Sequence, residues 1–195
     1  LLCRFDGQRV TMASQMSEAD ETVSSLYSVK SEQATMLSFD TYNYLVHYFG
    51  QPQGSMSDDP NGTLGGDYEF VISDATADRI ELKGKKYGNR IVMKAFSADQ
   101  TWKQYLTKIK KVEDDAFFYE YDLLMDGLYT GQMIRSNYTF IVTYYDEIGK
   151  VHQKTVPFMF TADGLRFHEP VTIDGQTMQN FVWKNELISL SLIHI

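Results

Sequence analysis

The residues best suited to hold a ligand form a dense aromatic cluster between positions 42 and 49. Aromatic faces pack against the apolar C–H surfaces of sugars, while hydroxyl and imidazole groups add hydrogen bonds. The predicted ligand-binding residues are Tyr42, Tyr44, His47 and Tyr48. The sequence leaves one alternative open, in which these rings and Phe49 fill the interior of a β-barrel or pack in its lid.

Two acidic pairs, Asp114 with Asp115 and Glu120 with Asp122, have the residue types that glycoside hydrolysis needs. Nothing distinguishes them from the other acidic residues, of which the chain has 26. The sequence contains no nucleophile-elbow, P-loop or dinucleotide-binding pattern. We therefore expect a protein that is not an enzyme and needs no cofactor, and we keep a hydrolase as the weakest hypothesis.

The potential metal-ligand residues of this chain do not have the sequence spacing of a local metal-binding motif. His47, His152 and His168 are isolated from one another, so a zinc site would need long-range assembly. Residues 58–63 with Asp67 are rich in oxygen ligands of the kind that Ca²⁺ takes, but they lack the EF-hand spacing. A polar loop is the favoured interpretation, and we predict no metal site.

The formal charge of −8 argues against nucleic acid as a partner, because phosphate binding needs a basic surface. The lysines of one stretch form a local basic run, which is typical of a solvated face: Lys83, Lys85, Lys86, Lys103, Lys108, Lys110 and Lys111. No run of about 18 apolar residues occurs, so no helix is predicted to span a membrane. The single cysteine, Cys3, allows no internal disulfide.

The elements that must position these residues are mostly strands. Apolar and polar residues alternate with period two, which indicates antiparallel strands with one face in water. The predicted strands include residues 25–29, 36–39, 68–72, 80–83, 90–93, 138–144 and 151–160. A shorter helix or turn is predicted at 42–49, ahead of Gly50 and Pro52.

One amphipathic helix is predicted over residues 97–112. Ser97 and Gln100 have the spacing of a capping box, in which two side chains satisfy free backbone donors at the helix start. An apolar stripe with helical spacing follows them, made of Trp102, Tyr105, Leu106 and Ile109. We expect this stripe to pack against a sheet.

The predicted fold class is mainly β, with a minor helical part. We expect an antiparallel meander forming lipocalin-like β-barrel units, with one packed amphipathic helix, because barrel closure removes unpaired edges. A faint repeat relates "YSVKSEQATMLSFDTYN" to "FMFTADGLRFHEPVT". The predicted domains are a barrel-like unit at 1–112 that ends in the helix, and a second, truncated β unit at 113–189.

Both ends of the chain suggest a fragment. The chain opens without Met in what resembles a strand, so we expect native sequence upstream. Its last six residues translate CTG TCT CTT ATA CAC ATC, a string that resembles a sequencing-library adapter. We therefore expect residues 190–195 to be an artefact of the DNA sequence and exclude them from fold arguments.

Several motifs together resemble a family of Bacteroidota lipoproteins known as domain of unknown function 4302: "FDGQRVTM", "SLYSV", "LSFDTYN", "GGDYEFVI", "ELKGKKYGNRI", "ADGLRFHEPVTIDG" and "FVWKNE". The resemblance covers nearly the whole chain to about position 186. It implies an outer-membrane lipoprotein of the cell envelope, held to the membrane through an N-terminal lipid anchor outside this sequence. It also implies an association with glycan uptake, and it supplies no catalytic residues.

The resemblance and the aromatic cluster together predict a non-catalytic module that binds a ligand or a partner during nutrient uptake. The expected partners are a glycan or an outer-membrane transporter, and not nucleic acid. The main alternative is a purely structural accessory subunit of an outer-membrane complex, with no small-molecule site.

Overall fold

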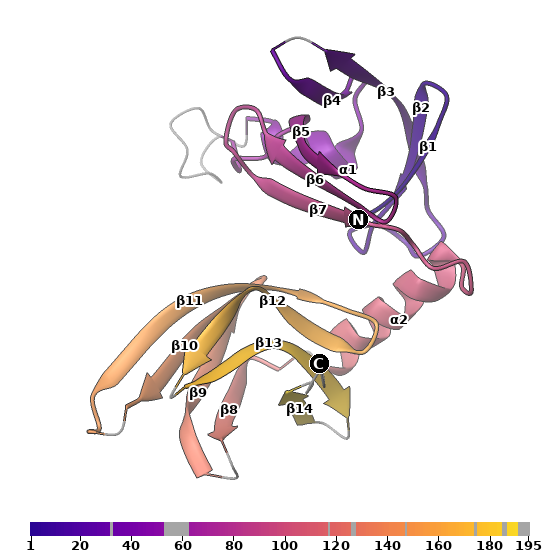
Figure 1. Ribbon diagram of the computed structural model, residues 1–195. Helices are drawn as coiled ribbons and strands as arrows, with labels where there is room; N and C mark the ends of the chain where they lie inside the picture. Colours follow the sequence, from indigo (N-terminus) through magenta and orange to yellow (C-terminus); the bar gives the residue numbers. More distant parts are fainter. Residues whose placement is uncertain are drawn as a thin grey trace. The chain divides into compact units, whose positions relative to one another are not determined.

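The computed structural model describes residues 1–31, 33–52, 63–116, 118–125, 128–146, 148–173, 175–184 and 187–190. The chain divides into two compact units, Leu1–Gln104 and Tyr105–Ile195. Each unit is built on one seven-stranded antiparallel sheet that follows the order of the chain (Figure 1). Of the residues predicted to be an artefact, 191–195 lie outside the described part of the chain.

The sheet of the first unit is a simple meander that curls on itself (Figure 1). Its strands are β1 (Leu2–Asp6), β2 (Arg9–Ala13), β3 (Val23–Ser31), β4 (Thr35–Phe39), β5 (Glu69–Ala75), β6 (Arg79–Gly84) and β7 (Arg90–Lys94). Between β4 and β5 lie a short α-helix, α1 (Tyr44–His47), and a 3-10 turn, η1 (Tyr48–Gly50). The short helix predicted at 42–49 is therefore confirmed.

The core of the first unit lies on the concave face of this sheet. The alternation of apolar and polar residues within the strands places apolar side chains on that face. Helix α1 packs two further apolar side chains against it. The buried cluster is Val10, Met12, Leu37, Phe39, Leu45, Val46, Phe70 and Leu82. Burying Leu45 and Val46 anchors α1, and with it the neighbouring aromatic residues.

The second unit repeats the architecture with β8 (Glu120–Met125), β9 (Leu128–Ser136), β10 (Thr139–Tyr145), β11 (Val151–Phe160), β12 (Gly164–Ile173), β13 (Gln176–Lys184) and β14 (Leu187–Leu190). Its core is dominated by phenylalanine: Phe140, Phe158, Phe160, Phe167 and Phe181. Phe140 and Phe158 stack with their ring centroids 4.3 Å apart. The pairing register of β12 and β13 shifts between Arg166 and Val171, which marks a bulge.

The long helix, α2, spans Trp102–Asp115, so the predicted start at 97 is wrong. The capping box is real but lies four residues later, at Thr101 and Gln104. The Gln104 backbone N–H donates to Thr101 Oγ1 at 3.2 Å, and the Thr101 N–H donates to Gln104 Oε1 at 2.8 Å. The predicted and the observed pair of residues both match the capping pattern. A shift of the helix start by about one turn leaves the apolar stripe nearly unchanged. The buried residues of α2 are Leu106, Ile109 and Val112.

Thr101→Ala is expected to lower the free energy of unfolding by about 1 kcal/mol, because the N-terminal amides of α2 lose their side-chain acceptor. Urea denaturation measures the change. Thr101→Ser should restore most of the stability, and Thr107→Ala, at an exposed position inside α2, serves as the matched control. Equal stability of Thr101→Ala and the wild type would contradict this assignment of the cap.

The predicted fold class is confirmed, because the chain is mainly β and both sheets are antiparallel meanders curled into half-barrels. Two α-helices, α1 and α2, accompany the sheets. Within the described ranges, no helix has the length and apolar content that crossing a membrane would require.

Candidate functional site

The candidate site is built around α1, which is fixed to the sheet by Asn43. This residue is fully buried, and its Oδ1 caps the helix by accepting from the Leu45 N–H at 3.1 Å. Its Nδ2 donates to Ser25 Oγ on β3 at 3.2 Å. A buried amide that is bonded on both sides holds a single orientation, so Asn43 sets the positions of the residues on either side of it.

Three rings from two distant segments form what we call the aromatic stack, made of Tyr42, His47 and Tyr68. The rings of His47 and Tyr68 are stacked, with centroids 4.9 Å apart and an angle of 20° between their planes. The rings of Tyr42 and His47 lie 5.5 Å apart and are tilted by 42°. Tyr42 is 63% exposed and Tyr68 is 45% exposed, so the stack presents aromatic surface to water.

Local hydrogen bonds orient the rings of the stack. His47 Nδ1 lies 3.1 Å from the backbone N of Asn43 and accepts a hydrogen bond from it. Gln51 Nε2 donates to the Tyr42 hydroxyl at 2.7 Å. These contacts reduce the rotamer freedom of the Tyr42 and His47 rings, which lowers the entropic cost of binding a ligand on them.

Two glycines allow the segment that carries Tyr68 to approach η1. The Gly66 N–H donates to the Phe49 carbonyl at 2.9 Å. A Cβ at Gly66 would collide with the Cβ of Phe49, and a Cβ at Gly50 would lie 3.1 Å from the Gly66 carbonyl oxygen. A side chain therefore does not fit at Gly66, and one at Gly50 would be tight, so these glycines favour the close pairing of the two segments.

The predicted ligand-binding residues divide into two groups. Tyr42 and His47 are members of the stack. Tyr44 instead packs against the core, and its hydroxyl donates to Glu21 Oε1 at 3.1 Å. Tyr48 lies edge-to-face with Phe49, with ring centroids 5.4 Å apart. The structure thus brings together two of the four predicted residues and adds Tyr68, which no local sequence signal links to them.

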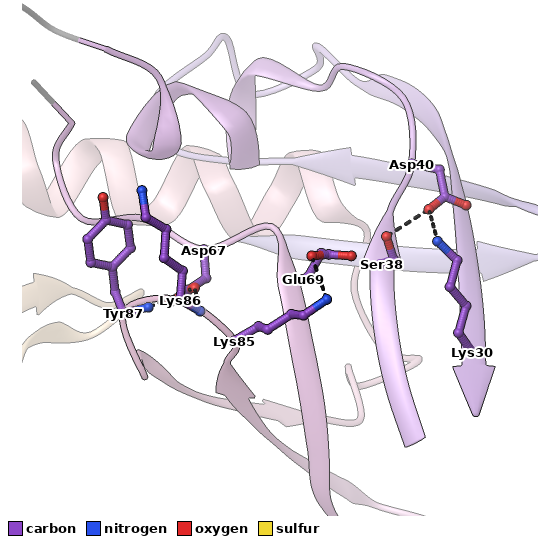
Figure 2. A network of polar contacts seen from close by, with 8 residues as sticks. All are labelled: Lys30, Ser38, Asp40, Asp67, Glu69, Lys85, Lys86 and Tyr87. Atoms are coloured by element: carbon purple, nitrogen blue, oxygen red, sulfur yellow. Dashed lines mark hydrogen bonds and ion pairs between the residues drawn. The ribbon is translucent and has the colours of Figure 1, made fainter. Parts of the chain in front are cut away.

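Asp67, next to the stack, is a buried carboxylate that holds the turn between β6 and β7. Its Oδ1 accepts the backbone N–H groups of Lys86 at 2.7 Å and Tyr87 at 3.1 Å (Figure 2). Its Oδ2 accepts from Asn89 Nδ2 at 2.9 Å. A Cβ at Gly84 would collide with this carboxylate. Asp67 is therefore engaged as a hydrogen-bond acceptor for the β6–β7 turn.

The other oxygen-rich positions of the calcium alternative, 58–62, lie outside the described residues. Among the residues that the structure describes, no group of three His, Cys, Asp or Glu side chains could hold a metal ion. His152 contacts Asp146 at 2.9 Å, and His168 is exposed on β12.

Much of the basic run is paired with carboxylates. Lys85 Nζ lies 3.1 Å from Glu69 (Figure 2), Lys103 lies 2.9 Å from Asp20, and Lys111 lies 2.6 Å from Asp115. These pairs are exposed, so each adds little stability.

A related contact lies on β4. The Ser38 hydroxyl donates to Asp40 at 2.7 Å and lowers the pKa of that carboxyl, with Lys30 3.4 Å from the same oxygen (Figure 2). The Asp40 carboxylate is therefore ionised at neutral pH and holds its contacts with Ser38 and Lys30.

Two open grooves lie elsewhere on the first unit. One of about 630 Å³ runs between β1, β2 and the residues that lead into α2, and one of about 450 Å³ lies beside β3. No ring of the aromatic stack lines either groove. The candidate site is thus an exposed platform, suited to stacking against the face of an extended ligand.

Comparison with known families gives one match. The model of a family described as "Domain of unknown function (DUF4302)" matches residues 1–185, which include Tyr42, His47 and Tyr68. No curated protein matches the chain, and no solved structure matches it.

Proposed function

The chain belongs to the DUF4302 family, and from that premise we propose that it is a non-catalytic binding module of the cell envelope that holds a glycan on the aromatic stack. The observation that carries the proposal is the row of three rings, Tyr42, His47 and Tyr68, two of which are strongly exposed. The envelope location, the lipid anchor and the link to outer-membrane nutrient uptake are parts of the same proposal, and they rest on the family resemblance.

The chemistry of the stack supports a glycan as the ligand. Successive sugar rings present alternating C–H faces and hydroxyls, which match aromatic faces bordered by the Tyr42 hydroxyl and the Gln51 amide. The formal charge of −8 disfavours acidic polysaccharides, because like charges repel. We therefore propose a neutral glycan as the ligand.

Tyr42→Ala and Tyr68→Ala are each expected to weaken glycan retention about two- to tenfold, since one aromatic contact contributes about 0.5–1.5 kcal/mol. The measurement is affinity electrophoresis through gels that contain neutral polysaccharides such as xylan, mannan or starch. The melting temperature should change little, because both rings are exposed. Tyr119→Ala, which removes a 71% exposed ring from the second unit, is the matched control.

Other results would favour the competing hypotheses. Unchanged retention with a large fall in melting temperature would mean that the rings serve only packing. Co-purification with an outer-membrane partner, without any retention by glycans, would favour a structural accessory subunit. Turnover of a polysaccharide that is lost on changing one carboxylate would favour a hydrolase.

A further inference from the structure

The strand β7 forms one edge of the first unit's sheet (Figure 1). Its only strand partner among the described residues is β6, in a register that pairs Arg79 with Lys94 and Lys83 with Arg90. An edge strand presents a row of backbone N–H and C=O groups that have no partner in the sheet, and such a row can pair with another chain. The free edge of β7 is therefore a binding surface made of main-chain atoms.

The hydrogen-bond pattern of the β6–β7 hairpin shows which backbone groups point away from β6. Near the turn the Gly84 N–H donates to the Asn89 carbonyl at 2.8 Å, and at the far end the Ala95 N–H donates to the Asp78 carbonyl at 3.0 Å. Because bonded positions alternate along an antiparallel pair, every second residue of β7 turns its N–H and C=O groups outward. These residues are Arg90, Val92 and Lys94.

The side chains of the same three residues lie on the convex face of the sheet. The opposite face of β7 is the core face, since Met93 packs against the buried cluster that contains Leu82. Val92 is 38% exposed, and Arg90 and Lys94 on either side of it are also exposed. A partner strand would therefore meet one apolar side chain between two cations.

The β6–β7 hairpin is a basic region of an acidic chain. It contains six cationic side chains and one carboxylate, that of Glu81. This carboxylate lies 3.4 Å from Arg90 and also contacts Arg79, so two arginines share it. Asp78, in the turn before β6, adds one acidic residue, but Lys94 forms no ion pair within the part of the chain that the structure describes. The cations remain in excess, and they favour a partner that carries carboxylates.

The charges of β7 also discriminate between possible partners. If two copies paired through β7 in an antiparallel register centred on Val92, Arg90 of each copy would lie opposite Lys94 of the other. Like charges directly opposite destabilise a strand pair, so these cations oppose self-association. An anionic polysaccharide would meet the cations but lacks the alternating amide groups that match the outward backbone groups of β7. An acidic peptide uses both features.

We propose that β7 binds an extended acidic segment of a partner protein by strand addition. The backbone of the segment pairs with the outward groups of Arg90, Val92 and Lys94, and two of its carboxylates face the two cations. Its residues on the core side contact Ile91 and Met93, so the recognised pattern is acidic, apolar, any residue, apolar, acidic. The inference is independent of the proposed glycan site, because it uses no ring of the aromatic stack.

The test uses the full chain, isotope-labelled for nuclear magnetic resonance, and the peptide Ser-Glu-Val-Thr-Val-Glu-Ser with blocked ends. Saturating peptide should slow the hydrogen exchange of the Val92 and Lys94 amides at least tenfold, because these outward N–H groups gain an acceptor. The amides of Ile91 and Met93, which already bond to β6, should change little. A peptide with lysine in place of both glutamates should bind at least tenfold more weakly.

Two variants separate the contribution of the backbone from that of charge. Val92→Pro removes an outward N–H but no bond to β6, so it should weaken peptide binding at least tenfold, whereas Val92→Thr should bind like the wild type. Lys94→Glu should weaken binding about tenfold at low ionic strength, and Lys108→Glu, the same charge change at an exposed position of α2, should not. If Val92→Pro does not fold, Lys94→Glu and the exchange of the outward amides still decide.

The proposal is overturned if the wild type does not bind the peptide, or if binding leaves the exchange of the Val92 amide unchanged. Equal binding of the lysine peptide would also overturn it, because charge would then not select the partner. Binding of dextran sulfate instead of the peptide, without protection of Val92, would assign the hairpin to a polyanion. A dimer in light scattering that Val92→Pro abolishes would assign the edge to a second copy.

Discussion

Phe140→Ala is expected to lower the free energy of unfolding by about 3–5 kcal/mol, the largest effect of any change considered for this chain. The Phe140 ring is completely buried, stacks on Phe158 at 4.3 Å and meets the ring of Tyr121 edge-on at 5.6 Å. Alanine would leave a cavity that rigid strands on both sides cannot close. Urea denaturation, with amide hydrogen exchange on peptides from β8 to β13, measures the loss and locates it in the second unit.

The control for this prediction is Met159→Ala on the neighbouring strand β11, where the side chain is 41% exposed. It removes a comparable apolar volume from the surface and should cost well under half as much. If Phe140→Ala and Met159→Ala destabilised the protein equally, the assignment of Phe140 to the centre of this core would be wrong. Glycan retention by the first unit should survive Phe140→Ala under conditions in which the chain stays folded.

Asp67→Ala is expected to cost about 3 kcal/mol, because it removes the acceptor for the backbone amides of the β6–β7 turn. Lys86, Tyr87 and Asn89 all donate to this carboxylate, which is only 7% exposed. Their amides would lose hydrogen bonds in a partly buried position. Thermal and urea denaturation report the loss, and hydrogen exchange should rise first in the peptide that contains the turn.

Two variants sharpen the test of Asp67. Asp67→Asn keeps the shape but only one acceptor oxygen, so it should recover part of the stability. Asp40→Ala removes a carboxylate that also accepts hydrogen bonds but is exposed, so it should cost less than about 1 kcal/mol. An Asp67→Ala variant as stable as Asp40→Ala would show that the turn does not depend on this carboxylate.

The proposed glycan binding gives a second readout for the same variant. Asp67 directly precedes Tyr68, so loosening the turn should also disturb the aromatic stack. Asp67→Ala is therefore expected to lose both stability and retention, whereas Tyr68→Ala should lose retention alone. This contrast separates the residue that contacts the ligand from the residue that positions it.

Local patterns predicted the elements well. The alternation of apolar and polar residues along strands such as β5 and β10 depends on backbone geometry that repeats every two residues. It can therefore be recognised in a single sequence. The short helix at 42–49 was predictable for a similar reason, because Gly50 and Pro52 interrupt helices within a few positions of themselves. The predicted start of α2 was wrong because the capping-box pattern occurs at both Ser97 and Thr101, which lie about one helical turn apart.

The candidate site was only half predictable. Tyr42 and His47 lie close together in the sequence, but Tyr68 reaches them through the pairing of β4 with β5. The Ser38↔Glu69 register and the hydrogen bond from the Phe39 N–H to the Tyr68 carbonyl at 3.0 Å place Tyr68 beside the residues that lead into α1. Register between strands depends on long-range pairing, which no window of adjacent residues contains.

The sequence by itself therefore determined the mainly β class, the meander order, the existence of both helices and the family to which the chain belongs. The tertiary structure decided which rings form the stack and what Asp67 does. The physical reason is the range of the forces involved. Propensity and capping act over a few residues, whereas ring contacts and buried hydrogen bonds depend on where the folded sheet brings distant residues together.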